Sequence, residues 1–247
     1  MLQTCPGLVA STSLVRLQRG LIALLVGLAW SVGVSLGAPA ATTWTVCASG
    51  CDYSSIKSAI AAPTTLDSDT LAVAAGTYTE AGITVNKSLT LQGERAATTI
   101  VQAAATKGTA PDRVFTIASG VTATLQDLTI RYGNTAGSGG GLENQGTLTL
   151  TRSTVWANKA TYSGGGLVNS GMLTLLNSTI SGNTANSGAA GGGLYIFFGA
   201  TRLTHSTISG NAADSAGGLV NSGTLTLTHS IVARNQHGGD CRRNDNG

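Results

Sequence analysis

Apolar and hydroxyl side chains alternate along the second half of the chain, and the same alternation returns about every 25 residues. Side chains on a β-strand point alternately to opposite faces, so the apolar set of each repeat faces an interior and the threonines beside it face water. A repeat of about 20–50 residues is typical of a solenoid, in which each coil stacks on its neighbours. The pattern therefore predicts an all-β fold, a parallel β-helix solenoid. Aligning the repeats gives two interior columns: Leu125, Leu150, Leu175, Leu203 and Leu227 in the first, and Ile130, Val155, Ile180, Ile208 and Val232 in the second.

An asparagine closes each repeat. Identical amides stacked at strand spacing can hydrogen-bond from coil to coil, and Asn tolerates the left-handed backbone of a tight turn. We therefore interpret this column as a structural ladder. Its members are Asn134, Asn158, Asn183, Asn211 and Asn235.

The segment before the regular repeats predicts a cap for the first coil. Tyr53, Ile56 and Ile60 fall at helical spacing and Pro63 ends the run, so we expect a short helix over 53–62. Such a helix would cover a sheet edge that otherwise invites pairing with another chain. Short strands are expected at 43–46, 71–73, 83–85 and 89–91, and a protruding loop at 103–112.

The first 40 residues have the pattern of a secretory signal peptide. Arg16 and Arg19 precede an apolar run over 21–36, and Ala38-Pro39-Ala40 is a small-x-small cleavage site. A retained membrane anchor is the alternative, but the apolar run is short for a span and is interrupted by Gly and Ser. We therefore expect a secreted or cell-surface protein with no stable membrane span after cleavage.

The chain accordingly divides into a signal peptide (1–40), an N-terminal cap with the first coils (41–113) and the regular β-helix coils (114–247). The last coil would leave Leu227 and Val232 at an open end, which a complete solenoid normally covers. We therefore expect the regular part to be truncated at its C-terminus.

Cysteine usage agrees with export. Cys47 and Cys51 are four apart, and an oxidising compartment would let them close a small loop as a disulfide. Two free thiols are the alternative. Cys5 lies in the leader, which leaves Cys241 as the odd cysteine of the mature chain.

The charge of the mature chain is close to zero. Removing Arg16 and Arg19 with the leader lowers the basic side chains from 14 to 12, against 11 acidic ones. No basic patch or interleaved aromatic pattern remains, so a nucleic-acid partner is not expected. The sequence predicts no metal site and no cofactor.

The repeats resemble those of right-handed parallel β-helix surface proteins. Gly-Gly-Leu followed by Ile180-Ser-Gly-Asn183 or Ile208-Ser-Gly-Asn211 is similar to the polymorphic outer-membrane-protein type. Segments 54–60, 76–80 and 87–93 look like the opening of pectin-lyase-like secreted proteins. The resemblance implies a right-handed β-helix with an adhesin-like place at the cell surface, but specifies no activity.

One polar column follows the Leu/Thr strand of each coil. Corners of a solenoid face water and collect polar residues, which is the interpretation we favour. The functional alternative is a binding stripe, in which Arg152 pairs with Asp127 and two neighbouring histidines contact a sugar or hold a metal weakly. The column consists of Asp127, Arg152, Asn177, His205 and His229.

Three classes of function fit these patterns. We favour a binding or structural module whose expected partner is carbohydrate or a cell-envelope component. A polysaccharide-degrading enzyme, such as a pectate lyase or esterase, is less favoured because the acidic residues of the coils share no aligned column. Gln126-Asp127-Leu128 is similar to a pectin methylesterase motif, but it coincides with the ordinary repeat register. Binding to ice or another flat surface through the outward threonines is the third class, although Leu176 and Arg202 interrupt those columns.

Overall fold

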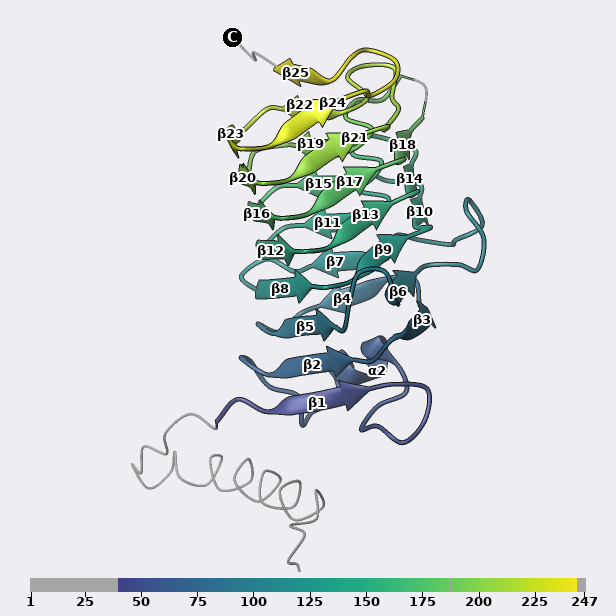
Figure 1. The fold of residues 1–247 in the computed structure, drawn as a ribbon, viewed down its shortest axis with the longest axis vertical. Coiled ribbons are helices and arrows are strands. Elements are labelled where there is room, and N and C mark those ends of the chain that lie inside the picture. Colours follow the sequence, from purple (N-terminus) through teal and green to yellow (C-terminus); the bar gives the residue numbers. More distant parts are fainter. Residues whose placement is uncertain (1–39, 187, 244–247) are drawn as a thin grey trace, which may run out of the picture. The chain divides into compact units, whose positions relative to one another are not determined.

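The computed structural model describes residues 40–186 and 188–243, so almost all of the predicted signal peptide lies outside the described residues. Short parallel strands follow one another around each coil, and the coils stack in register along one axis (Figure 1). The longest sheet has eight strands, one from each of eight coils. The predicted all-β solenoid is confirmed. Within the described part, no helix combines the length and the hydropathy of a membrane span.

Each regular coil contributes one strand to each of three long sheets. The first sheet contains β1 (Thr43–Val46), β2 (Thr70–Val73), β5 (Thr90–Gly93), β8 (Thr122–Gln126), β12 (Thr147–Thr151), β16 (Met172–Leu176), β20 (Ala200–Thr204) and β23 (Thr224–Thr228). The second contains β3 (Gly76–Thr79), β6 (Thr99–Gln102), β9 (Thr129–Arg131), β13 (Thr154–Trp156), β17 (Thr179–Ser181), β21 (Thr207–Ser209) and β24 (Ile231–Ala233). The third contains β4 (Ile83–Val85), β7 (Phe115–Ile117), β11 (Leu142–Asn144), β15 (Leu167–Asn169), β19 (Leu194–Ile196), β22 (Leu219–Asn221) and β25 (Cys241–Arg243). A short fourth sheet joins β10 (Asn134–Thr135), β14 (Lys159–Ala160) and β18 (Thr184–Ala185).

The two predicted apolar columns face the interior of the coils. Backbone pairing places Leu125 beside Leu150, and the same register continues through the following coils. Four of the five leucines are fully buried, whereas Leu227 in the last coil is 46% exposed. Because each fully buried Leu or Ile contributes about 1.5–3 kcal/mol, these stacks account for much of the stability.

The helix α2 (Ile56–Ala61) covers the first coil, as predicted, but it is shorter than 53–62. The start is later because Tyr53 pairs with β1: its N–H donates to the Thr45 carbonyl at 3.0 Å. Through Ile56, Ala59 and Ile60, the helix packs against β1, β2 and β4.

The N-terminus of α2 begins at the N-cap Ser55 and is also held by the carboxylate of Glu80, which follows β3. Glu80 accepts hydrogen bonds from the backbone N–H groups of Ile56 and Lys57, both at 2.9 Å. These N–H groups have no partner within the helix, and a negative charge is favourable at this end. The Gly-Thr-Tyr-Thr-Glu segment at 76–80 therefore has a structural role through Glu80.

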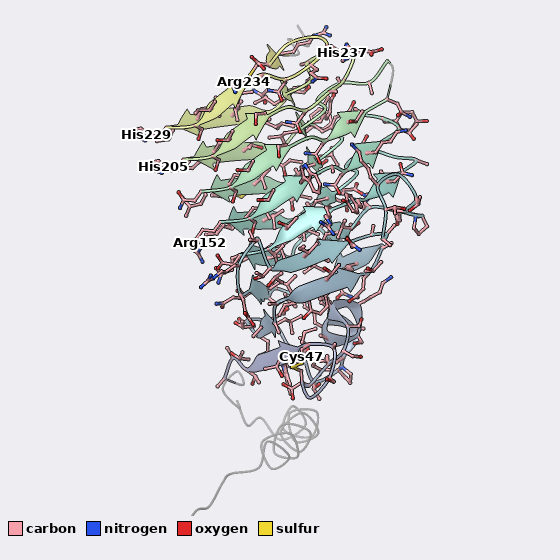
Figure 2. All side chains as sticks on the ribbon, turned by 45° about the vertical axis from the view of Figure 1, so that its right-hand side comes forward. Cys47, Arg152, His205, His229, Arg234 and His237 are labelled. Carbon is pink, nitrogen blue, oxygen red and sulfur yellow. A yellow bond between two sulfur atoms is a disulfide. The ribbon has the colours of Figure 1, made fainter. Side chains whose placement is uncertain are left out.

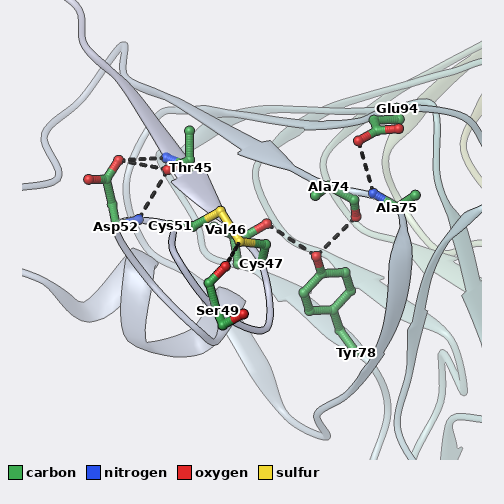
Figure 3. Close-up of a disulfide and its surroundings, with 10 residues drawn as sticks. All are labelled: Thr45, Val46, Cys47, Ser49, Cys51, Asp52, Ala74, Ala75, Tyr78 and Glu94. Carbon is green, nitrogen blue, oxygen red and sulfur yellow. Dashed lines mark hydrogen bonds between the residues drawn. A yellow bond between two sulfur atoms is a disulfide. The ribbon is translucent and has the colours of Figure 1, made fainter.

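Cys47 and Cys51 form the predicted disulfide, which is confirmed, with a Cα–Cα distance of 5.6 Å (Figure 3). It closes the turn between β1 and the bridge at Tyr53. Cys241 is exposed on β25 and is free.

Four asparagines form a hydrogen-bonded ladder along the axis: Asn158, Asn183, Asn211 and Asn235. Each of the first three donates from both Nδ2 and its backbone N–H to the Oδ1 of the next, at 2.9–3.0 Å. The last bonds in the series run from Asn235 to the Asp240 carboxylate, at 2.8 and 2.9 Å. Each amide thus satisfies backbone and side-chain groups that the coils bury.

Asn134 does not belong to this ladder, so the prediction was wrong at that residue. Gly133 is the residue that donates to Asn158 Oδ1, at 2.8 Å, because Asn134 follows the interior Ile130 by four positions rather than three. Asn134 instead donates to the carbonyls of Gly108 and Ala110 in the loop 103–112. The expectation of left-handed ladder residues was also wrong, since the left-handed φ falls one residue earlier, as at Ala157 (56°).

Replacing Asn183 with Ala is expected to lower the free energy of unfolding by about 3 kcal/mol, because the buried N–H of Asn158 and the Val155 carbonyl lose their partners. Asn134→Ala is the matched control and should lose less than about 1 kcal/mol, since its amide holds only the loop. Urea denaturation followed by circular dichroism measures both values. Equal losses would contradict the assignment of the ladder.

Asp240 should make the end of the ladder sensitive to acid. Hydrogen bonds from the backbone and the side chain of Asn235 lower the pKa of Asp240. Stability from a lowered pKa is present above the unfolded value of about 3.9 and is lost as the pH falls through the folded value. Asp240→Asn keeps an oxygen acceptor but does not titrate. We therefore expect the wild type to have the higher Tm at about pH 6 and the difference to shrink toward about pH 2. A difference that stays constant with pH would argue against this coupling.

Candidate functional site

The predicted polar column lies along one edge of the first sheet, where each strand ends and the chain turns; we call it the corner stripe. Its residues directly follow β8, β12, β16, β20 and β23, and Figure 2 shows three of them along one side of the stacked coils. All five have a left-handed φ, between 47° and 60°. The same turn therefore recurs in each coil and presents its side chain from an equivalent position. The five residues are Asp127, Arg152, Asn177, His205 and His229.

Asp127 and Arg152 form a bidentate ion pair across two coils. The distances are 2.7 Å from Arg152 Nε to Asp127 Oδ1 and 2.5 Å from Nη2 to Oδ2. The Arg152 side chain is 53% exposed, so the pair contributes little to stability. Its effect is to fix the orientation of the Asp127 carboxylate.

His205 and His229 stack face to face at the other end of the stripe. Their ring centroids are 5.0 Å apart and the planes are within 5° of parallel. Imidazole binds a metal through a lone pair in the plane of the ring, and parallel stacked rings do not direct two lone pairs at one ion. The observed arrangement is therefore suited to a surface contact rather than to the weak metal site considered from the sequence. Asn177 is exposed between the two pairs.

An open groove of about 510 Å³ lies at the N-terminal end of the same sheet edge. The sequence did not predict it, because its residues come mainly from the first coils, which lack a constant repeat length. Asp127 belongs to both the groove and the corner stripe. The polar lining consists of Thr43, Thr45, Gln92, Glu94 and Asp127.

Small residues create the hollow. Backbone pairing places Thr45, Ala72 and Gln92 side by side on the outward face, so the short Ala72 lies between two longer side chains. A Cβ at Gly93 would lie 2.4 Å from the Asp127 carbonyl oxygen, so glycine is required for this close approach of the coils.

The disulfide loop borders the groove. Cys51 contributes to the lining, and Figure 3 shows the disulfide beside Thr45 and Val46. Glu94 accepts a hydrogen bond from the Ala75 N–H at 3.1 Å, which fixes one carboxylate oxygen (Figure 3). Because Glu94 precedes the regular coils, the repeat spacing does not align it with Asp127. The groove therefore holds two positioned carboxylates and one exposed amide.

The outward threonines form one row along the first sheet. Thr43, Thr70, Thr90, Thr124, Thr149 and Thr174 pair in succession from β1 to β16, and Arg202 stands in their place on β20. The row is one residue wide at β16, because the outward neighbours of Thr174 are Met172, which is 61% exposed, and Leu176. A row that is one residue wide and is broken at Arg202 does not present hydroxyls in two dimensions, which does not favour binding to ice.

Two solved structures are similar to this chain in fold. Pectin methylesterase from Erwinia chrysanthemi is 17% identical with a TM-score of 0.51, and the match covers 82% of this chain and 68% of that one. A mutant of pectin methylesterase in complex with a hexasaccharide is 16% identical with a TM-score of 0.53, covering 84% and 68%. The chain is a right-handed parallel β-helix. At this identity the likeness shows the fold alone, which is the pectin-lyase-like β-helix that the N-terminal segments imply. No protein-family model matches the sequence, and no curated protein matches it.

A substitution at a left-handed turn of the corner stripe should destabilise the protein more than a similar substitution on a neighbouring strand. Asn177→Val is expected to lower the free energy of unfolding by about 1–2 kcal/mol, because a β-branched side chain is strained at a φ of 51°. Thr174→Val, on the adjacent strand, should change stability by less than about 0.5 kcal/mol. Urea denaturation compares the two variants. A neutral Asn177→Val would contradict the description of this corner.

Proposed function

We propose that this protein is a secreted or cell-surface β-helix that binds carbohydrate, and that the groove is its sugar site. The observation that carries the proposal is the groove itself, an open hollow lined by an exposed amide and two carboxylates. Sugar hydroxyls both donate and accept hydrogen bonds, so such side chains on a concave face suit them. The leader pattern and the Cys47–Cys51 disulfide support export.

The charge of the groove favours a neutral sugar. Asp127 is paired with Arg152, whereas Glu94 accepts from a backbone N–H rather than from a cationic side chain. A polymer of uronic acids would meet the negative charge of Glu94, and like charges brought together weaken binding. A neutral oligosaccharide has no such penalty and can use Gln92 and the carboxylates as hydrogen-bonding partners.

The corner stripe gives the groove a polar continuation. Neighbouring coils are about 4.8 Å apart, so the stripe from Asp127 to His229 extends over about 19 Å. An oligosaccharide lying along the axis would occupy the groove and then pass Arg152 and the stacked histidines. Asn158, Asn183 and Asn211 of the ladder are buried, Asn235 is partly buried, and all four remain structural in this proposal.

A polysaccharide-degrading enzyme is the second candidate. Glu94 and Asp127 line one groove, and glycoside hydrolysis uses two carboxyl groups at one site. Both oxygens of Asp127 accept from Arg152, however, which makes it a fixed acceptor rather than a proton donor. Binding is therefore the function that the geometry supports best.

The double substitution Gln92→Ala and Glu94→Ala is expected to weaken sugar binding by at least about tenfold. Two hydrogen-bonding side chains are removed from the groove, each worth about 0.5–1.5 kcal/mol. A glycan array identifies the ligand, and isothermal titration calorimetry compares the affinities. Gln145→Ala is the matched control, because Gln145 is an exposed glutamine beside the third sheet.

Two results would overturn the proposal: no oligosaccharide on the array binds, or the double variant keeps the wild-type affinity. Pectin offered to the wild type also tests the enzyme. Release of methanol or reducing ends that is lost in Glu94→Gln would favour catalysis over binding.

A further inference from the structure

A second polar and aromatic surface lies on the outward face of the second sheet, away from the groove. Backbone pairing places four residues of successive coils in one outward row, on β3, β6, β9 and β13. These are Thr79, Gln102, Arg131 and Trp156. Together with Tyr132, which follows β9, we call them the aromatic row.

A chain of hydrogen bonds positions the cation in this row. Gln102 Nε2 donates to Thr79 Oγ1 at 3.0 Å, and Gln102 Oε1 accepts from Arg131 Nε at 2.9 Å. Gln102 is only 4% exposed, so both ends of its amide are committed and its orientation is set. The Arg131 guanidinium is therefore held from its Nε side.

The face of the same guanidinium rests on an aromatic ring. Arg131 Cζ lies 4.5 Å from the centroid of the Tyr132 ring, a cation–π contact. Among the described residues, no carboxylate forms an ion pair with Arg131. The structure thus presents a planar, oriented cation that has no ion-pair partner in the part of the chain that it describes.

Trp156 continues the row as an exposed ring. It is 39% exposed, and its ring lies 5.6 Å from that of Tyr132 at an angle of 44°. A Cβ at Gly182 in the next coil would come within 3.1 Å of the indole Nε1. Glycine at that position leaves room for the indole to lie along the surface instead of being lifted away from it.

The backbone at Tyr132 is strained. Its φ is 59°, and a bulky residue in the left-handed region is uncommon. The equivalent turn of later coils has Ala157, Gly182, Gly210 and Arg234, of which only the glycines adopt this conformation without strain. Such strain is found preferentially at binding sites. At this turn it places an aromatic ring between the cation and the indole.

We propose that the aromatic row binds a uronic-acid residue of an acidic saccharide. The apolar C–H face of the sugar ring would stack on Trp156, and the carboxylate would accept from the Nη groups of Arg131. A planar guanidinium matches a carboxylate in geometry, and an exposed aromatic ring offers apolar area at little conformational cost. This inference does not depend on the groove, which has the opposite charge preference and lies on another sheet.

The test uses the full secreted chain and defined probes. Oligomers of galacturonate, glucuronate and mannuronate are compared with their carboxyl-reduced counterparts, which differ only at the acid group. Isothermal titration calorimetry measures affinity, and tryptophan fluorescence reports on the site because Trp156 is exposed whereas Trp44 is buried. We expect at least one acidic oligomer to bind and its reduced form to bind at least about tenfold more weakly.

Two substitutions locate the site. Trp156→Ala and Arg131→Gln should each weaken binding of the acidic oligomer by at least about tenfold. Arg131→Lys keeps the charge without the planar fork and should retain more binding than Arg131→Gln. Tyr162→Ala and Arg202→Gln remove a more exposed aromatic ring and a more exposed arginine elsewhere, and they should leave affinity unchanged.

Three outcomes would overturn the inference. They are equal affinity for acidic and reduced oligomers, no binding of any acidic oligomer with an unaltered fluorescence spectrum, or full affinity in both Trp156→Ala and Arg131→Gln. Circular dichroism confirms that the variants are folded. Neutral-sugar binding that depends on Gln92 and Glu94 would survive each of these outcomes, so a failure here is distinguishable from a failure of the groove.

Discussion

Successive coils are joined by in-register parallel backbone pairing, and this pairing decides which side chains can meet. A residue and its partner in the next coil lie about 4.8 Å apart, so whatever is repeated at one position becomes a continuous column. Leucines in such a column shield each other from water, and amides in such a column form hydrogen bonds with each other. A change at an inward position therefore affects the coils on both sides, because it exposes apolar surface or leaves buried polar groups without partners. Outward positions have no such constraint, and both candidate surfaces are built mainly from them.

The turns extend the same constraint to the corners. Every residue of the corner stripe has a left-handed φ, although Gly and Asn suit that conformation best. Asp127 and Arg152 form an ion pair across adjacent coils, and His205 and His229 form a ring stack. Both contacts exist because the turns repeat at strand spacing. A polar corner column is therefore a consequence of the architecture. Recognition of a ligand by this column would depend on which side chains occupy it.

Much of the fold could be predicted from the sequence, because the inward columns leave a periodic pattern. Alignment of the leucines placed Leu125, Leu150 and Leu175 in the register that the strands have. The same alignment failed at Asn134, where one extra residue after Ile130 shifts the asparagine out of the ladder. Sequence spacing does not reveal a shift of one residue, whereas a buried amide that is shifted by one residue loses its hydrogen-bonding partners.

The candidate sites were harder to predict for two physical reasons. The groove depends on Gln92 and Glu94 in coils whose lengths vary, so no period brings them beside Asp127 in the sequence. In the aromatic row, the register alone places Arg131 beside Trp156, but it does not indicate that the tryptophan stays exposed. That exposure depends on Gly182 in the next coil, and the orientation of Arg131 depends on Gln102, so both follow from the three-dimensional contacts. Hydrophobic periodicity reflects the packing of the interior. It contains little information about side chains that face water.

The groove and the aromatic row differ in charge, and the scaffold tolerates this difference with little loss of stability. Glu94 gives the groove a negative character, whereas Arg131 on the second sheet is a cation with no ion pair to any described carboxylate. Because the sheets face different directions around the same core, a charge on one does not have to be matched on the other. Each outward side chain can also vary without disturbing the leucine stack behind it. A solenoid of this kind can therefore hold two sites of opposite preference on one core, and a polymer with both neutral and acidic sugars is the ligand that would engage them together.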